Sequence, residues 1–527
     1  MSAPLRLLHI TGWRGRGLCA ALGAAAVLGQ APFHIWPITI GALALLLARL
    51  KAVQSTRAGF GTAFWFALGY FLVGTYWIGS AFIARGPQFI PLMVPMVAGL
   101  GGVLALFWGA AGAFFVRARL QGAAAALGFV SLFFLAEFSR GHLFGGFPWN
   151  LLGYVFDAGR PISQTASLIG VYGLTMIVLI LAACLEPVIS GAGRLKGSLA
   201  GLAIAGLLYG GGTWRIKTSP SESVANVILR IVQVRFSQRD KLDQQKAINI
   251  VNEFLTQSVS PGIEAVTHVV WPEGAINGVA LDNEAFISVM GSELTRRDLT
   301  PPIWLLNSLR HEQRPNPYDG SVIDDYYNSS AALSFDAQGI ATLAAYNDKQ
   351  KLVPFGEFIP GGKLMEARNV PVISTSLLSI SAAKTKGLSI FPGLPKLSPQ
   401  ICYEIIFSGF TPHPKGEPRA EWILNQSNDA WYGDSIGPRQ HANMAAYRAI
   451  EEGVPVVRAA SNGLSGVINP LGHYIISAGP KETGVIDARL PKPFKPTFFG
   501  RRINILLALI NLLISLCCCT LLRSGHR

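Results

Sequence analysis

Ser398-Pro-Gln-Ile-Cys402-Tyr-Glu404 closes an apolar run with the pattern of a buried strand, and the rest of the chain can be understood by working outward from it. Cys402 is the only cysteine between residues 214 and 500, so it has no disulfide partner within that segment. The other cysteines all lie in strongly apolar runs: Cys19, Cys184, Cys517, Cys518 and Cys519. A lone thiol that follows a strand and precedes a carboxylate is a candidate nucleophile.

Strand-like and helix-like runs alternate on both sides of this stretch. We expect strands at 227–234, 265–271, 303–307, 329–334, 397–403, 422–426, 454–460 and 463–468. We expect helices at about 239–258, 282–297 and 436–452. This alternation predicts an α/β domain. On a strand, residues two apart face the same side, so Glu404 is expected beside Cys402.

The rest of the chain is strongly apolar. Half of its 527 residues are hydrophobic, only 14% are charged, and the mean hydropathy is +0.38. Runs near the ~20 residues that span a bilayer occur at 17–33, 36–50, 58–83, 91–116, 122–139, 161–187, 196–213 and 503–522. We therefore expect an α-helical transmembrane bundle of eight spans. The predicted domains are 1–213 (seven helices), 214–500 (the α/β domain) and 501–527 (the last helix and a short tail).

Lys and Arg are unevenly distributed among the short loops. They gather at the N-terminus and in alternate loops, whereas the opposite loops carry only Arg85, Arg140 and Arg160. The positive-inside rule therefore places both termini in the cytoplasm and residues 214–500 outside. The first span resembles a cleaved signal peptide, but six further spans follow directly, so we expect it to be retained. These basic loops account for much of the net charge of +14, and no nucleic-acid partner is expected.

Two further charged residues follow strand-like runs. Glu273 closes Val269-Val-Trp-Pro-Glu, and Lys349 begins a segment that ends in Leu352-Val-Pro-Phe-Gly-Glu357. A thiol with an ordinary pKa near ~8.5 needs a base or a cation to react at neutral pH. Glu273 can supply the base, and Lys349 can stabilise both a thiolate and an oxyanion. The alternatives are a structural cysteine, a solvated charge cluster and a surface glutamate.

These motifs together resemble a known family. Trp271-Pro-Glu273, Lys349 with Glu357, and Cys402-Tyr-Glu404 are similar to the Glu–Lys–Cys triad of the nitrilase (carbon–nitrogen hydrolase) superfamily, whose domain is an αββα sandwich. Asn425-Gln-Ser-Asn-Asp-Ala-Trp-Tyr-Gly433 extends the match. Among nitrilases, membrane spans on both sides of the domain are typical of the apolipoprotein N-acyltransferase family of bacterial inner membranes. The membrane-region motif Glu137-Phe-Ser-Arg140-Gly fits that family as well.

The resemblance implies a role for each residue. Glu273 would be the general base, Lys349 the cation beside the oxyanion, and Cys402 the nucleophile. Supporting or site-lining residues would be Glu357, Glu404, Asn328, Tyr403 and Trp431. Cys402 would take an acyl chain from a phospholipid, the sn-1 chain of a phosphatidylethanolamine, as a thioester. The acyl chain would then pass to the α-amino group of the diacylglyceryl-cysteine at an apolipoprotein N-terminus.

The resemblance also implies the setting of the reaction. The protein would be a monomer of the bacterial inner membrane whose catalytic domain lies in the periplasm, where both of its substrates are membrane-anchored. No cofactor and no metal are expected, since the nine histidines lack any paired spacing.

Three features of the sequence concern lipid contact and packing. Residues 361–396 are rich in Gly, Pro, Ser and Leu, and we expect Leu364, Met365 and their apolar neighbours to line the lipid entrance; a packed surface loop is the alternative. Trp149 is expected to contact lipid or to anchor the chain at the membrane interface. Glu137 and Arg140, three residues apart, are expected to form a structural ion pair on one helix face.

Two rival functions stay open at this point. A membrane-tethered nitrilase-type amidase would use the same triad and pass its thioester to water. A transporter or receptor with an external binding domain would instead need polar residues within its spans, and the spans contain few.

Overall fold

The computed structural model describes residues 10–191, 194–281, 283–296, 301–315, 320, 322–358, 380–383, 388–412, 416 and 418–501. The chain forms two compact units. The helical unit contains the described residues of 1–220, 431–453 and 495–527, and the sandwich unit contains those of 221–430 and 454–494.

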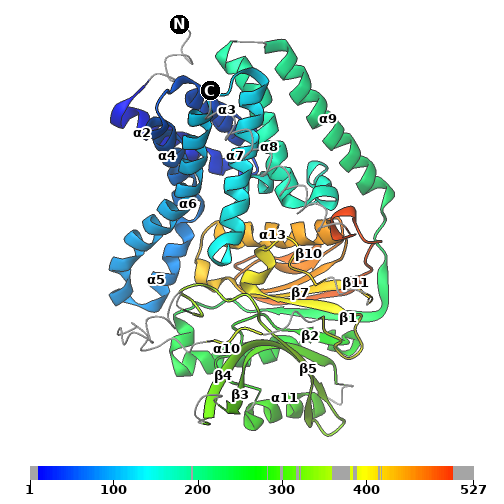
Figure 1. Ribbon diagram of the computed structural model, residues 1–527. Coiled ribbons are helices and arrows are strands. Elements are labelled where there is room, and N and C mark those ends of the chain that lie inside the picture. The colour runs from blue at the N-terminus through cyan, green and yellow to red at the C-terminus, as the bar shows by residue number, and fades with distance from the viewer. Residues whose placement is uncertain are drawn as a thin grey trace. The chain divides into compact units, whose positions relative to one another are not determined.

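The helical unit is built from helices, most of which are long and apolar (Figure 1). They are α2 (Gly12–Ala26), α3 (Trp36–Ala52), α4 (Thr56–Gly74), α5 (Gly79–Arg85), α6 (Ile90–Ala118), α7 (Gly122–His142), α8 (Ala166–Ser190), α9 (Arg194–Thr218) and α13 (Gly437–Glu452). Local capping sets some of their ends. The Ser55 side chain accepts a 3.1 Å hydrogen bond from Ala58 N at the start of α4, and Gly453, at φ +67°, ends α13.

Three of these helical stretches are long and apolar enough to cross a membrane: Pro87–Ala118, Gly122–Gly145 and Ile162–Ser190. Thr56–Gly74 and Tyr76–Arg85, bent by 51° at a short break, add a fourth if the pair is one span. The described residues thus give three or four candidate spans where the sequence predicts seven. Helices α2 and α3, of 15 and 17 residues, fall short in length. The predicted span 503–522 and Cys517–Cys519 lie outside the described residues.

Helix α13 belongs to the helical unit by its contacts, although the sequence predicts it within the α/β domain. The Tyr447 hydroxyl on α13 donates a 2.6 Å hydrogen bond to the Phe156 carbonyl. The backbone N–H of Val171, near the start of α8, donates a 2.8 Å hydrogen bond to Glu451 Oε1. These polar contacts satisfy a carbonyl of the segment between α7 and α8 and an N–H group of α8 just after Gly170, where its helical backbone is interrupted.

The sandwich unit contains two mixed β-sheets. The six-stranded sheet has the order β11-β1-β2-β3-β4-β5, in which β1, β2 and β3 are parallel. Its strands are β1 (Ser223–Gln233), β2 (His268–Val270), β3 (Ile303–Pro315), β4 (Val322–Phe335), β5 (Ala341–Asp348) and β11 (Gly484–Pro491). The five-stranded sheet has the order β10-β9-β8-β7-β6, in which β6, β7 and β8 are parallel. Its strands are β6 (Leu397–Ile401), β7 (Trp422–Asn428), β8 (Val456–Ser461), β9 (Ser465–Ile468) and β10 (Tyr474–Ala478).

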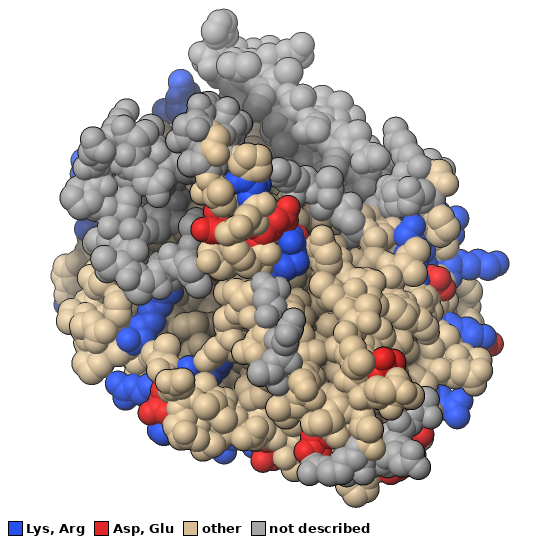
Figure 2. Space-filling view, turned by 90° about the horizontal axis from the view of Figure 1, so that it is seen from below, with Lys and Arg blue, Asp and Glu red and all other residues tan. Residues whose placement is uncertain are grey.

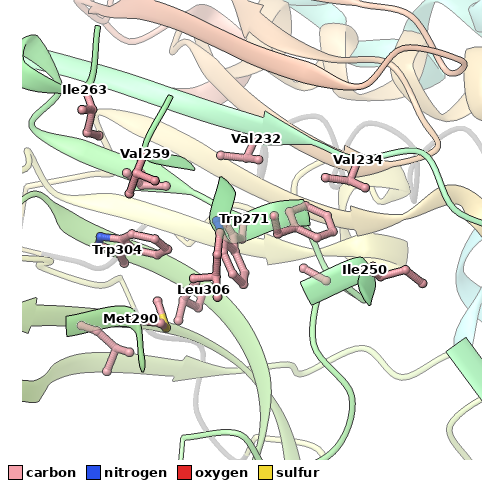
Figure 3. Packing of buried hydrophobic residues seen from close by; sticks show 14 of the residues in the cluster. Val232, Val234, Ile250, Val259, Ile263, Trp271, Met290, Trp304 and Leu306 are labelled. Atoms are coloured by element: carbon pink, nitrogen blue, oxygen red, sulfur yellow. The ribbon is translucent and has the colours of Figure 1, made fainter. Parts of the chain in front are cut away.

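Two apolar clusters divide this unit into layers. One cluster joins the two sheets and includes Leu229 of β1, Leu305 of β3 and Leu424 of β7, all buried. The other lies on the opposite face of the six-stranded sheet, where Trp271 and Trp304 pack with side chains of α10 (Gln244–Ser258) and α11 (Glu284–Arg296) (Figure 3). The unit therefore has a helix–sheet–sheet arrangement, held by large buried apolar side chains.

The expected strands are present but several differ in length. The hairpin of β3 and β4 is much longer than the apolar runs suggest, because polar residues extend it; Arg314, for example, forms an ion pair with Asp325 on the facing strand. The predicted strand 397–403 ends at Ile401, and Cys402 begins a 3₁₀ helix, η9 (Cys402–Ile406).

Charges of both signs lie on the face of the molecule seen in Figure 2. On the described part of the face seen in Figure 2, Lys and Arg side chains are interspersed with Asp and Glu, without a continuous basic surface.

Candidate active site

Cys402 stands at a sharp turn between β6 and η9. Its φ is +49°, a left-handed conformation that non-glycine residues adopt only a few per cent of the time. Such conformations concentrate at active sites, because the surrounding structure must hold them in place. The residue is 8% exposed, so the thiol is largely shielded from bulk solvent.

Glu273 follows β2 after Trp271 and Pro272, and several neighbouring strands fix its position. The backbone N–H of Asn428, at the end of β7, donates a 2.9 Å hydrogen bond to Oε2. The side-chain amide of Asn328 on β4 donates a 2.8 Å hydrogen bond to Oε1. The Ser461 hydroxyl on β8 donates to the main-chain carbonyl of Glu273 at 2.9 Å. The carboxylate is therefore oriented by both sheets before any substrate arrives.

Lys349 follows β5 and is 1% exposed. Its Nζ donates a 2.9 Å hydrogen bond to Glu357 Oε1 and lies 3.5 Å from Glu273 Oε1. Burial alone would lower the pKa of this ammonium, but the charges of Glu357 and Glu273 outweigh burial and raise its pKa. Lys349 is therefore a permanent cation at neutral pH.

The Cys402 thiol belongs to the same electrostatic cluster. Burial is the largest cause that raises its pKa, to about 12, and the Glu273 carboxylate adds to it. Lys349 acts in the opposite direction, as does a side-chain hydrogen bond with Ser427. The resting thiol is thus protonated and needs a base at the moment of attack. Glu273, held in the same cluster, is a carboxylate that can accept the proton.

The strand pattern predicts Glu404 beside the thiol, but β6 ends at Ile401 and Glu404 lies in η9. Its Oε1 accepts hydrogen bonds from the backbone N–H groups of Gln350 and Lys351 at 2.7 and 3.0 Å. Its Oε2 accepts a 2.8 Å hydrogen bond from Ile401 N. Glu404 thereby ties the segment after Lys349 to the turn that carries Cys402.

The structure thus brings together most of the predicted site residues within the sandwich unit: Glu273, Lys349, Cys402, Glu357, Glu404 and Asn328. Asn328 Nδ2 also donates to Glu357 Oε1 at 3.1 Å, so one amide bridges two carboxylates. Tyr403 is 8% exposed and packs edge-on against Phe407, with ring centroids 5.1 Å apart.

Other predicted residues lie elsewhere. Trp149 and Trp431 belong to the helical unit. The lipid contact or interfacial anchoring expected of Trp149 and the site-lining role expected of Trp431 stay predictions. Trp149 is 1% exposed and donates a 2.7 Å hydrogen bond to Gln440 Oε1 of α13. The guanidinium of Arg85 lies 5.9 Å from the centroid of the Trp431 ring. Leu364 and Met365 lie outside the described residues.

Sequence reasoning missed Asn428 and Ser461, which hold Glu273. Both stand at the carboxyl ends of parallel strands of the second sheet, where polar residues after buried strands are the available signal. Among the described residues, no group of three or more His, Cys, Asp or Glu side chains is placed to hold a metal ion. A buried thiol and a buried ammonium with a partly buried carboxylate suit acyl transfer through a covalent thioester.

Comparison with known proteins gives matches over both parts of the chain. The model of the apolipoprotein N-acyltransferase N-terminal domain matches residues 22–184, and the carbon-nitrogen hydrolase model matches residues 237–493. Three relatives that carry the name apolipoprotein N-acyltransferase are similar over most of their length. The protein from Rhodopseudomonas palustris is 33% identical over 96% of this chain and 95% of its own. The protein from Caulobacter vibrioides is 34% identical over 91% of this chain and 89% of its own. The protein from Bradyrhizobium diazoefficiens is 32% identical over 95% of this chain and 95% of its own.

Proposed function

Because this chain belongs to the apolipoprotein N-acyltransferase family and its reaction is the N-acylation of lipoproteins, we propose that the acyl chain passes through a thioester on Cys402. The observation that carries the proposal is the shared electrostatic cluster of Cys402, Glu273 and Lys349. A thiol can serve as the nucleophile, a carboxylate as the general base, and an ammonium as the cation that stabilises the oxyanion.

In the first half of the reaction, Cys402 Sγ attacks the carbonyl carbon of a phospholipid ester while Glu273 accepts the thiol proton. The carbonyl oxygen becomes an oxyanion, and the permanent charge of Lys349 stabilises it. The carbon–oxygen bond of the ester then breaks. The lysophospholipid alkoxide takes the proton from Glu273 and leaves, and the acyl chain stays on sulfur.

In the second half, the α-amino group of the diacylglyceryl-cysteine attacks the thioester carbonyl. An α-amino group has a pKa near ~8, so a useful share is neutral at pH 7. Glu273 accepts the proton that the amine loses, the carbon–sulfur bond breaks, and the thiolate is reprotonated by Glu273. The product is the N-acylated lipoprotein. Burial of Cys402 and Lys349 supports this sequence, because a site that excludes water protects a thioester from hydrolysis.

We infer the setting from the sequence. The apolar runs favour eight spans, and the distribution of Lys and Arg favours both termini in the cytoplasm and the catalytic domain, residues 214–500, in the periplasm. The donor is taken to be phosphatidylethanolamine, and the enzyme to be a monomer that meets its membrane-anchored substrates by diffusion in the bilayer. Cysteine substitutions in the loops, labelled by an impermeant maleimide in intact spheroplasts, test this orientation.

The thioester itself can be observed. Purified protein is incubated with a phospholipid that carries an alkyne-tagged acyl chain, without acceptor, and is then digested and analysed by mass spectrometry. We expect the tag on Cys402, its release by neutral hydroxylamine, and its transfer to an added diacylglyceryl peptide. Cys402→Ala should lose the tag, whereas Cys184→Ala, in the helical unit, should keep it. A tag on any other side chain, or acyl transfer by Cys402→Ala, would contradict the mechanism.

A further inference from the structure

A second ammonium lies beside the catalytic base. Lys241 stands in η7 (Asp240–Leu242), on the segment between β1 and α10. Its Nζ is 3.2 Å from the point where a Cβ on Gly274 would stand, and Gly274 directly follows Glu273. Nζ also lies 5.6 Å from the centroid of the Phe236 ring, a distance at which a ring attracts a cation.

The segment that carries Lys241 is fixed to the active site on several sides. The Asn277 side chain donates a 2.8 Å hydrogen bond to the Lys241 carbonyl. Gln238 Oε1 accepts a 3.1 Å hydrogen bond from Asn428 Nδ2, and Asn428 is the residue whose backbone holds Glu273. The position of the ammonium is therefore tied to the position of the base.

The carboxylates around Lys241 are already engaged with other groups. Asp240 Oδ1 accepts a 2.8 Å hydrogen bond from Lys246 Nζ, and Asp243 caps α10. Glu273 is held by Asn328, Asn428 and Lys349. Within the part of the chain that the structure describes, Lys241 Nζ forms no ion pair. Burial lowers its pKa to about 8, although the charge of Glu273 acts in the opposite direction. A half-buried ammonium that no carboxylate contacts directly is costly unless a ligand supplies an anion in contact with it.

We propose that Lys241 binds the phosphate group of the donor phospholipid during the first half of the reaction. This inference rests on the proposed function. Both substrates bring glycerol esters to the site, since the acceptor carries a diacylglyceryl group of its own. Only the donor has a phosphate, attached to the same glycerol as the ester that is attacked. A cation beside Glu273 that is free to bind that phosphate selects the donor ester over the acceptor esters.

Lys349 cannot perform this selection, because Glu357 and Glu273 already neutralise it and its task is at the carbonyl oxygen. A phosphate at Lys241 adds one charge-assisted hydrogen bond to the donor complex. Such a bond is worth about 10-fold or more in affinity. Lys241 is in this role a donor-binding residue, and the chemistry at sulfur does not require it.

The test compares a charged with an uncharged acyl donor. Thioester formation on Cys402 is followed in single turnovers with the full-length protein in detergent micelles. The donors are phosphatidylethanolamine and 4-nitrophenyl palmitate, an ester without a phosphate. For Lys241→Met we expect the half-saturating concentration of phosphatidylethanolamine to rise about 10-fold or more. The rate with the uncharged ester should stay within about twofold of wild type, since Lys241 acts only on the phosphate.

Matched variants complete the test. Lys246→Met removes a nearby lysine that is already paired and should leave both donors unaffected. Lys241→Arg should retain most of the donor affinity. Should Lys241→Met fail to fold, Lys241→Gln takes its place.

Equal losses with both donors would overturn the inference, because they would indicate a structural or chemical role. It would also fail if thioester formation were normal and only transfer to the amine were slowed. The absence of any thioester in the wild-type protein would instead contradict the proposed function itself.

Discussion

Lys349 donates a 2.9 Å hydrogen bond from Nζ to Oε1 of Glu357. Because of this pair, the counter-ion of Lys349 and the catalytic base are two different carboxylates. An ammonium that is 1% exposed needs a permanent counter-ion to stay charged. The catalytic base, however, must become neutral in each half-reaction when it accepts a proton. Glu357 keeps Lys349 charged throughout the cycle and leaves Glu273 free to gain and lose its proton.

Glu357→Gln tests this division. The substitution removes the permanent counter-ion, so Lys349 forms its ion pair with Glu273. The ammonium is then drawn away from the oxyanion, and the carboxylate is less able to accept a proton. We expect kcat for lipoprotein acylation to fall about 100-fold or more, the loss typical when the stabilisation of an oxyanion is removed. The measurement is steady-state transfer to a diacylglyceryl peptide. Glu312→Gln, which alters an exposed ion pair with Arg310, is the control and should keep wild-type activity. Activity of Glu357→Gln within a few-fold of wild type would show that Glu273 alone suffices.

Alkylation of Cys402 by iodoacetamide should report its charged neighbours. With a pKa of about 12, the thiolate fraction at neutral pH is very small, so the alkylation rate should rise tenfold per unit between about pH 7 and pH 9. Glu273→Gln removes a negative charge that raises the thiol pKa, and should therefore speed alkylation at each pH while it abolishes acyl transfer. Lys349→Met removes a charge that lowers the pKa, and should slow alkylation.

The opposite signs of these two variants make the alkylation experiment decisive. Mass spectrometry of the Cys402 peptide gives the rates, with the Cys184 peptide from the helical unit as the internal reference. Equal changes in Glu273→Gln and Lys349→Met would mean that neither charge acts on the sulfur in the way the structure indicates.

Asn328→Leu removes the amide that bridges the two carboxylates while roughly keeping the size of the side chain. Glu273 loses a 2.8 Å donor and Glu357 a 3.1 Å donor, so both carboxylates are less well held. We expect kcat to fall about 10- to 100-fold, as for the loss of one or two hydrogen bonds to charged groups. Asn307→Leu removes an amide that donates to Asn328 and Ser329, and should have a smaller effect. A larger loss in Asn307→Leu than in Asn328→Leu would contradict this order.

The apolar runs of the sequence predict the α/β unit, and the three residues of the proposed triad stand just after strand-like runs. Glu273 after β2, Lys349 after β5 and Cys402 after β6 follow this pattern. The apolar runs also predict the strands whose both faces are buried. The sequence predicts strands β3 and β4 shorter than they are, because polar residues such as Arg314 and Asp325 lack the apolar pattern of a strand. Their ion pair forms only across the two facing strands.

Other features depend on contacts that no local pattern encodes. The strand pattern continues through Cys402, but three backbone donors capture Glu404 and help turn the chain there, with Cys402 at φ +49°. The polar sequence around Lys241 predicts a solvated side chain. Its position beside the base is seen only in the structure, where its Nζ lies close to Gly274, the residue after Glu273. The sequence predicts α13 as a helix of the α/β domain, yet its polar side chains form hydrogen bonds with Phe156 and with Val171 of α8, both in the helical unit.

The expected ion pair of Glu137 and Arg140 is confirmed, and its setting predicts a purely structural role. Arg140 binds Glu137 through Nε and Nη2 at 2.6 and 2.7 Å, and both side chains are fully buried. Glu137 Oε1 also accepts a 2.9 Å hydrogen bond from Trp108 Nε1. Glu137→Ala leaves a guanidinium unpaired in an apolar bundle, which costs about 3–5 kcal/mol. We therefore expect thermal unfolding in detergent several degrees below wild type. The control is Asp157→Ala, which breaks the exposed pair with Arg160 and should change the Tm little. If Glu137→Ala unfolds at the same temperature as this control but has lost acyl transfer, the pair acts in the reaction and not in holding the helices together.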